Sequence, residues 1–159
     1  MGSAVFVLME IRALLKRPLV TVEKDVSIRE AARKMEKEDV GFLVVVDERG
    51  QVCGVISERD IARLIAEGVD PDKTRVGDVA RKEIITINYR DPVSKAAYLM
   101  KKHKIRHLVV VDDEGKPIGV VSVRDIVDLE IALENLSKVS ELSEEEEEQI
   151  YTSPIKVTT

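Results

Sequence analysis

An internal repeat constrains the fold of this chain more than any other feature. Shifting the 159-residue sequence by 65 positions aligns residues 20–62 with residues 85–127, and 17 of the 43 ungapped positions are then identical. The shared features come in the same order in both copies, which indicates a duplication. Two copies are too few for a solenoid, and about 45 residues are too few to bury a good core alone. We therefore expect the copies to pack together about a pseudo-twofold axis.

Each copy reads as strand, helix, strand, tight turn, strand and helix. The middle strand of each copy is an unbroken apolar run, which predicts burial on both faces. Polar segments ending in Gly50 and Gly115 follow these strands and predict hairpin turns in which glycine takes a positive φ. The predicted strands are 19–22, 43–46 and 52–56 in the first copy and 84–87, 108–111 and 117–121 in the second. The fold class is therefore predicted as α/β, with two pseudosymmetric β-α-β-β-α repeats packed through their sheets.

Helix-start signals and composition set the expected boundaries. Ser27 begins a Ser-x-x-Glu pattern and Asp91 precedes a proline, and both are ordinary helix starts. Apolar residues at helical spacing continue from Ile126 to Leu136, so the last helix is expected to extend beyond the repeat. The expected units are repeat 1 at 8–68, a polar linker at 69–78, repeat 2 at 79–132, and a helix extension with an acidic tail at 133–159.

The net negative charge is confined to the tail. The chain has 25 Lys and Arg against 30 Asp and Glu, but residues 141–159 hold six acids and one base, so residues 1–140 balance to zero. With a neutral body, no basic stripe and five aromatic residues, the chain is not expected to bind nucleic acid. The glutamate run is expected to be a solvated end rather than a site.

Several features predict a cytoplasmic protein. Cys53 is the single cysteine, which excludes an intramolecular disulfide, and no basic segment precedes the short apolar run 4–9 as it would in a signal peptide. No stretch approaches the ~18 apolar residues of a membrane span. Charged residues make up 35% of the chain whereas Asn and Gln total four, a bias typical of proteins from hot environments.

One motif recurs where the second helix of each copy should begin: Gly54-Val-Ile-Ser57-Glu-Arg59-Asp60 and Gly119-Val-Val-Ser122-Val-Arg124-Asp125. A Ser-x-x-Asp helix start is close to a capping box, which explains the serine and the aspartate. It does not explain an arginine beside the positive helix end, where a cation costs roughly 0.3–1 kcal/mol. A bound phosphate, with sugar hydroxyls on the aspartate, would explain all three residues. The residues alone leave nucleotide binding and simple capping equally open.

The order of elements, the runs Phe42–Asp47 and His107–Asp112, and the doubled Gly-x-x-Ser-x-x-Asp motif resemble a tandem pair of CBS (cystathionine-β-synthase) domains, also called a Bateman module. The resemblance covers about residues 8–132. It implies a regulatory module, not an enzyme, that binds adenosyl ligands such as AMP, ADP or ATP in clefts between the repeats. In some members the ligand is S-adenosylmethionine. The resemblance also implies a homodimer.

The resemblance implies a role for each residue of the motif. The aspartate holds the ribose hydroxyls, and the preceding serine and nearby basic residues approach the phosphates. The strand-end threonine and its neighbouring backbone line the adenine and phosphate region. The expected ligand-binding residues are Ser57, Arg59, Asp60, Ile84, Ile85, Thr86, Arg106 and His107 for one cleft, and Val20, Thr21, Gly41, Phe42, Ser122, Arg124 and Asp125 for the other.

The two clefts look crossed and unequal. Asp60 is expected to lie with Thr86, Arg106 and His107 of the second copy, whereas Asp125 is expected to lie with an uncharged glycine and a phenylalanine of the first. The Asp60 cleft then has two additional phosphate partners. We therefore expect it to bind nucleotide more tightly.

Other reactive or apolar residues have structural interpretations. His103 and His107 lie four apart without a cysteine cluster or a carboxylate at ligand spacing, so no metal site is expected. Cys53 is expected to be a small packed hydrophobe. Met35 and Met100, with their neighbouring alanines, predict a helix-packing face. If the chain itself left that face uncovered, helices of a second subunit could approach it closely.

Three classes of function remain open. An adenine-nucleotide sensor is favoured, and because no effector domain fits in the remaining residues, its output is expected to reach a partner in trans through the last helix and the tail. The second class is an interaction scaffold with vestigial clefts. The third is a nucleotide hydrolase, but the sequence shows no nucleophile beside a base, no carboxylate cluster and no Walker-type loop. No catalytic cofactor is expected.

Overall fold

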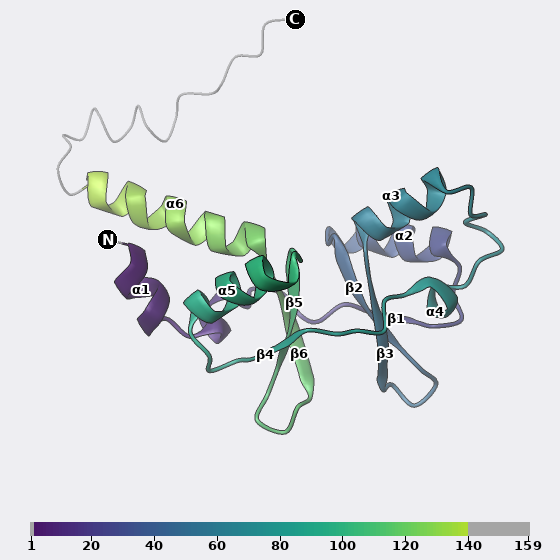
Figure 1. The fold of residues 1–159 in the computed structure, drawn as a ribbon, viewed down its shortest axis with the longest axis horizontal. Helices are drawn as coiled ribbons and strands as arrows, with labels where there is room; N and C mark the ends of the chain where they lie inside the picture. Colours follow the sequence, from purple (N-terminus) through teal and green to yellow (C-terminus); the bar gives the residue numbers. More distant parts are fainter. Residues whose placement is uncertain (1, 140–159) are drawn as a thin grey trace, which may run out of the picture.

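The chain folds into two similar halves, each a small sheet covered by helices (Figure 1). The computed structural model describes residues 2–139, and the predicted acidic tail lies outside them. The first half contains β1 (Thr21–Glu23), α2 (Ile28–Glu38), β2 (Phe42–Val46), β3 (Val52–Ser57) and α3 (Glu58–Ala66). The second contains β4 (Thr86–Asn88), α5 (Val93–His103), β5 (His107–Val111), β6 (Pro117–Ser122) and α6 (Val123–Val139). Two short helices, α1 (Gly2–Leu8) and η1 (Ile11–Leu14), precede the first half in the chain, and α4 (Val76–Val79) precedes the second.

The two sheets have the same topology and register. In the first, β1 is parallel to the central strand β2, and β3 is antiparallel to it; β4, β5 and β6 repeat this arrangement. Thr21 pairs with Val44, and Thr86 pairs with Val109, so both partners shift by the repeat length of 65 residues. The predicted α/β class with two β-α-β-β-α repeats is confirmed.

The hairpin turns follow the predicted chemistry. Gly50 and Gly115 have φ angles of +77° and +82°, in the left-handed region that side chains with a Cβ disfavour. In each turn an aspartate, Asp47 or Asp112, accepts hydrogen bonds from two backbone N–H groups. Glycine and aspartate together therefore stabilise both turns.

The central strands are buried on both faces because each face meets a different layer. In β2, Leu43 and Val45 pack in the core beneath the helices of their own half. Phe42 and Val44 point the other way and pack with Val109 of β5, in an apolar cluster between the two sheets. The sheets thus stand side by side at the centre of the molecule, with helices toward its two ends (Figure 1).

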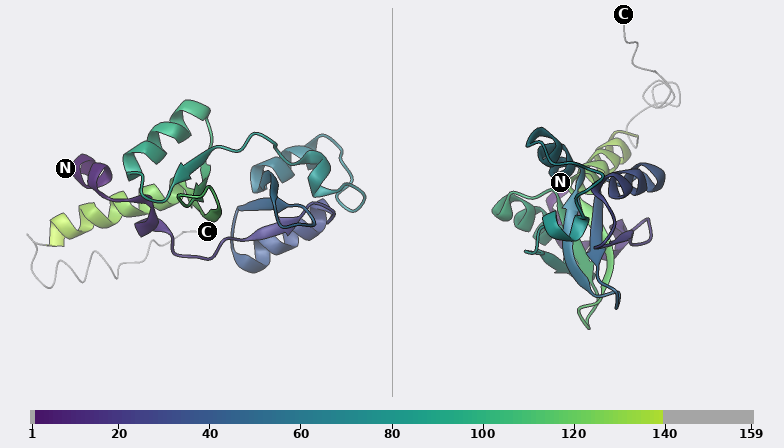
Figure 2. Two further views of the ribbon diagram at one scale, coloured as in Figure 1. Left: turned by 90° about the horizontal axis from the view of Figure 1, so that it is seen from below. Right: turned by 90° about the vertical axis from the view of Figure 1, so that its right-hand side faces the viewer.

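The two halves exchange the segments that precede them. Ile11 and Leu14 of η1 are buried in the core of the second half, whereas Val76 of α4 is buried in the core of the first. Figure 2 shows α1 beside the helices of the second half, and α1 contacts both α5 and α6. The predicted boundaries, with repeat 1 at 8–68 and a linker at 69–78, follow the order of the chain; the packing adds that each core also contains a segment that precedes the other half. A short apolar turn does not encode which sheet it covers, so the local pattern missed the exchange.

The apolar helix faces are covered within the chain. Ala31, Met35, Ala96 and Met100 are all buried against the sheet of their own half, so this face is not open to a second subunit. Large exposed apolar side chains occur instead on the outer helices, at Ile65 of α3 and at Val123, Val127, Ile131 and Leu136 of α6. The last helix does extend beyond the repeat, as predicted.

Candidate functional site

A cleft of about 780 Å³ opens between the two halves, where α6 begins. This volume lies within the ~300–1,000 Å³ typical of small-molecule sites. Both halves and the segment before β1 contribute to its lining. Eight of the predicted site residues line it: Val20, Gly41, Phe42, Arg106, His107, Ser122, Arg124 and Asp125.

Asp125 stands in the first turn of α6 with part of its carboxylate free. Its Oδ2 accepts hydrogen bonds from the backbone N–H of Ser122 at 2.7 Å and from the Ser122 hydroxyl at 3.1 Å. The Asp125 N–H in turn donates to Ser122 Oγ at 3.2 Å, which completes the predicted helix cap. Among residues 2–139, Oδ1 has no hydrogen-bond partner. One carboxylate oxygen therefore remains available to a ligand in the cleft.

Three cations border this cleft without an acidic partner. Lys16, Arg106 and Arg124 line it, and none of them forms an ion pair with any residue that the structure describes. Arg17, by contrast, pairs with Asp39 across 3.5 Å. The lining is mixed in charge, because Glu36, Asp39, Glu58 and Asp128 also border the cleft. Arg124 stands in the first turn of α6, where a bound anion would offset the repulsion between this cation and the positive helix end.

The same cleft has an apolar wall. Pro18, Leu19 and Val20 come from the segment that enters β1, Met35 comes from α2, and Val120 comes from β6. Apolar surface at one part of a pocket and a few polar groups at another are the usual composition of a site for an organic ligand.

Asp60, the equivalent residue of the first half, is closed off. Its side chain is 8% exposed. Ser57 and Asp60 form a complete capping box at the start of α3, with Ser57 N–H donating to Asp60 Oδ2 at 2.8 Å. Arg81 Nε also donates to Oδ2, at 3.1 Å, and an Arg63 guanidinium nitrogen donates to Oδ1 at 3.2 Å. Both oxygens of this carboxylate are therefore occupied by the chain itself.

The space on the Asp60 side is correspondingly small. In the described part of the chain it is a cavity of about 20 Å³, lined in part by Arg81, Ile84, Ile85, Ile105 and His107. A volume of this size holds about one water molecule. The two motifs are thus alike in local structure and different in the space beside them.

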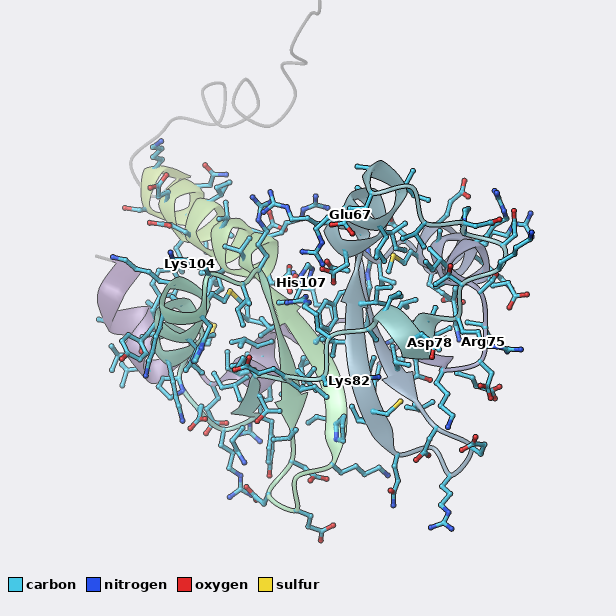
Figure 3. The ribbon with its side chains drawn as sticks, turned by 45° about the vertical axis from the view of Figure 1, so that its right-hand side comes forward. Glu67, Arg75, Asp78, Lys82, Lys104 and His107 are labelled. Carbon is cyan, nitrogen blue, oxygen red and sulfur yellow. The ribbon has the colours of Figure 1, made fainter. Side chains whose placement is uncertain are left out.

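His107 lies at the pseudo-twofold axis, where the two clefts meet. It stands at the start of β5 in the space between the halves (Figure 3). Its ring stacks on that of Phe42, which is the equivalent residue 65 positions earlier. Burial lowers the pKa of His107 below its ordinary value of 6.5; Arg81 and Arg106 act in the same direction, whereas Glu58 and Asp125 oppose it. His107 lines both cavities.

Some predicted residues lie elsewhere. Arg106 was expected beside Asp60, and the structure places it in the lining of the Asp125 cleft. The start of β5 lies at the axis between the repeats, so sequence position does not decide which cleft a long side chain enters. Five predicted residues line neither cavity of the described chain: Thr21, Ser57, Arg59, Asp60 and Thr86.

Sequence reasoning missed Lys16 and Arg81. The first lines the large cleft, and the second contacts Asp60. They are 65 residues apart and therefore equivalent, but they fall just outside the aligned block. Extending the alignment toward its N-terminal end is the signal that would have revealed them.

Among the described residues, no group of three or more His, Cys, Asp or Glu side chains is arranged to hold a metal ion. No helix in residues 2–139 has both the length and the apolar character needed to cross a membrane.

The model of the CBS domain matches residues 11–67 and again residues 76–131. This chain belongs to the CBS domain family. Its two CBS domains correspond to the two copies of the repeat. CBS domain pairs are regulatory modules, so the family places this chain among such modules.

Curated relatives of this CBS pair are mostly longer. An uncharacterised protein of Methanopyrus kandleri is 34% identical over 116 residues, which are 72% of this chain and 59% of the relative. The L-aspartate semialdehyde sulfurtransferase of Methanocaldococcus jannaschii is 32% identical over 116 residues, 73% of this chain but 22% of the enzyme. The chain thus spans less than two thirds of the length of each of these two relatives.

Solved structures of CBS proteins have the same fold. A CBS domain protein from Pyrobaculum aerophilum complexed with AMP is 37% identical, has a TM-score of 0.70, and is matched over 79% of this chain and 99% of its own. A CBS domain pair in complex with 5′-methylthioadenosine and S-adenosyl-L-methionine is 31% identical with a TM-score of 0.70, over 77% of this chain and 95% of its own. Related CBS pairs therefore bind adenosyl compounds.

Proposed function

We propose that this CBS pair is a regulatory module that binds an adenine nucleotide in the cleft beside Asp125 and signals its presence to a partner protein in trans. One observation carries the proposal: a helix-capping carboxylate retains a free oxygen in a cleft of about 780 Å³ bordered by three unpaired cations. The AMP complex of the Pyrobaculum aerophilum relative supports the ligand class.

Each part of the cleft has a role in this proposal. Asp125 accepts a hydrogen bond from a ribose hydroxyl through its free Oδ1. Lys16, Arg106 and Arg124 hold the phosphate, assisted by the N–H groups at the start of α6. The apolar wall before β1 covers the adenine. The sequence favoured the Asp60 cleft; the geometry supports the reverse order.

The position of the ligand supports a regulatory role. The cleft is lined by both halves, so a bound nucleotide contacts both and favours one relative packing over another. Asp125 is in the first turn of α6, a 17-residue helix that leads away from the cleft. A change at the start of this helix is carried to its far end, where a partner can detect it.

We also propose that a second copy of the chain covers the outer helices. Ile65 on α3 and Val127 on α6 are about half exposed, and the two helices lie on the same side of the molecule (Figure 1). Sedimentation of the purified chain tests this: a dimer that becomes a monomer in Val127→Glu supports the proposal, and a monomeric wild-type chain contradicts it.

Ligand-dependent stabilisation tests the proposed function. AMP at 100 times its dissociation constant should stabilise the fold by about 2.7 kcal/mol. Loss of a hydrogen bond to a charged group costs ≈1.5–3 kcal/mol, so Asp125→Asn should weaken binding about 10- to 100-fold. Asp60→Asn is the matched control in the other half and should leave affinity unchanged.

The remaining outcomes separate the alternatives. Stabilisation by S-adenosylmethionine alone would reassign the ligand within the adenosyl class. A flat response to AMP, ADP, ATP and S-adenosylmethionine would favour an interaction scaffold. Appearance of ADP or AMP after incubation with ATP and Mg²⁺, abolished in Asp125→Asn, would show a hydrolase instead.

A further inference from the structure

Arg81 ties the segment between the halves to the start of α3. Its backbone N–H and C=O both bond with Val55 of β3, each at 2.9 Å, so the backbone is fixed beside the sheet. From there its Nε donates to Asp60 Oδ2 at 3.1 Å. The carboxylate is 8% exposed and Arg81 is 39% exposed, so the contact is partly shielded from water.

The second half lacks this arrangement. A shift of 65 residues makes Lys16 the equivalent of Arg81, and Asp128 the equivalent of Arg63. Lys16 forms no ion pair with any described residue, and the carboxylate of Asp128 cannot donate to that of Asp125. The two copies therefore differ at the two positions that decide whether the motif aspartate is free.

The space for a ligand is also smaller beside Arg81 than beside Asp125. The cavity beside Arg81 is about 20 Å³ and is bordered by Ile84, Ile85 and Ile105, whereas the cleft of Asp125 is about 780 Å³. A nucleoside does not fit in a volume that holds about one water molecule. Shape and hydrogen bonding therefore close the first cleft together.

We infer that Arg81 is the internal occupant of the first cleft and limits this chain to one adenosyl ligand, bound at Asp125. The inference rests on the proposed function and adds the number of sites to it. Arg81 bonds Asp60 Oδ2 from the fixed segment beside β3, and the more exposed Arg63 bonds Oδ1, so the two guanidinium groups together occupy the carboxylate that a ribose would need. Arg81 is therefore a specificity-determining residue, although it lies outside the repeated motif.

Calorimetric titration of AMP into the full chain measures the number of sites directly. The wild-type chain should bind one AMP, and Arg81→Ala should bind two. Lys82→Ala, which removes the neighbouring cation that lines neither cavity and bonds the Gly77 carbonyl, should stay at one site. The double variant Arg63→Asp with Arg81→Lys copies the residues of the second half and should also bind two, which gives a second route if Arg81→Ala does not fold.

The outcomes distinguish this inference from the function on which it rests. Two sites in the wild-type chain would overturn the inference and leave the function intact, and AMP density beside Asp60 in soaked wild-type crystals would do the same. One site in both folded variants would also overturn it. No binding in any chain would contradict the proposed function itself, and the inference with it.

Discussion

The rings of Phe42 and His107 stack with their centroids 4.7 Å apart and their planes inclined by 19°. The two residues are equivalent in the repeat, so the stack marks the pseudo-twofold axis itself. Phe42 is buried with Val44, Val55 and Val109 in the cluster that joins the two sheets. One pair of rings thus contributes to the contact between the halves and to the lining of both cavities.

Phe42→Ala should destabilise the fold strongly. Removing a buried phenylalanine leaves a cavity between the sheets and costs about 3–5 kcal/mol. Urea denaturation measures the free energy of unfolding. Tyr98→Ala is the control, because Tyr98 is 60% exposed and its loss should change stability by no more than about 0.5 kcal/mol. Equal effects of the two substitutions would show that the sheet–sheet cluster is not part of the stabilising core.

The stability of the fold should fall in mild acid because of His107. Burial lowers the pKa of His107, so the folded chain favours the neutral imidazole. An unfolded histidine titrates near pH ~6.5. The contribution of the neutral imidazole to stability is therefore full above that pH and is lost as the pH falls through the depressed folded-state pKa. Urea denaturation at a series of pH values in this range gives the free energy of unfolding. This free energy should depend less steeply on pH in His107→Gln than in the His103→Gln control.

A bound phosphate should raise the pKa of His107. An anion near the imidazole favours its protonated form and opposes the effect of burial. NMR titration of the His107 ring protons should show a higher pKa with AMP than without it, whereas adenosine, which lacks the phosphate, should produce a smaller change. A pKa that AMP leaves unchanged would place the phosphate away from the axis.

Gly54→Ala should destabilise more than Gly119→Ala. A Cβ on Gly54 would lie 2.9 Å from the Ala80 Cβ and 3.0 Å from the carbonyl oxygen of Arg81, and that backbone cannot shift easily. A Cβ on Gly119 would lie 2.8 Å from a methyl group of Leu15, which can rotate away. We expect a loss of about 1–3 kcal/mol for the first and less for the second, measured by thermal or urea denaturation. The reverse order would show that the exchanged segments pack differently from the structure.

Much of each half follows from local chemistry. The turn glycines, the buried central strands and the capping of α3 and α6 all depend on residues close together in the chain, and the structure has them as predicted. The CBS pair follows from the order of these features. Local interactions of this kind can be predicted from the sequence because their partners lie within a few residues.

The difference between the two clefts could not be predicted from local sequence patterns. Arg81 lies 21 residues from Asp60, and nothing in the intervening sequence indicates that the chain returns to α3. Arg106 lies at an axis where both clefts are within reach of a long side chain. The prediction that the Asp60 cleft binds nucleotide more tightly depended on such distant contacts. The geometry favours the cleft of Asp125 instead.

The amino-acid order alone therefore established a duplicated α/β unit with a nucleotide-type motif in each copy, because repetition, turns and helix caps are encoded over short stretches of chain. Only the three-dimensional packing decided that η1 and α4 change places and that Arg81 closes one motif while Lys16 leaves the other open. The physical reason is that these contacts join residues distant in sequence, and their energies depend on which side chains the folded backbone brings together.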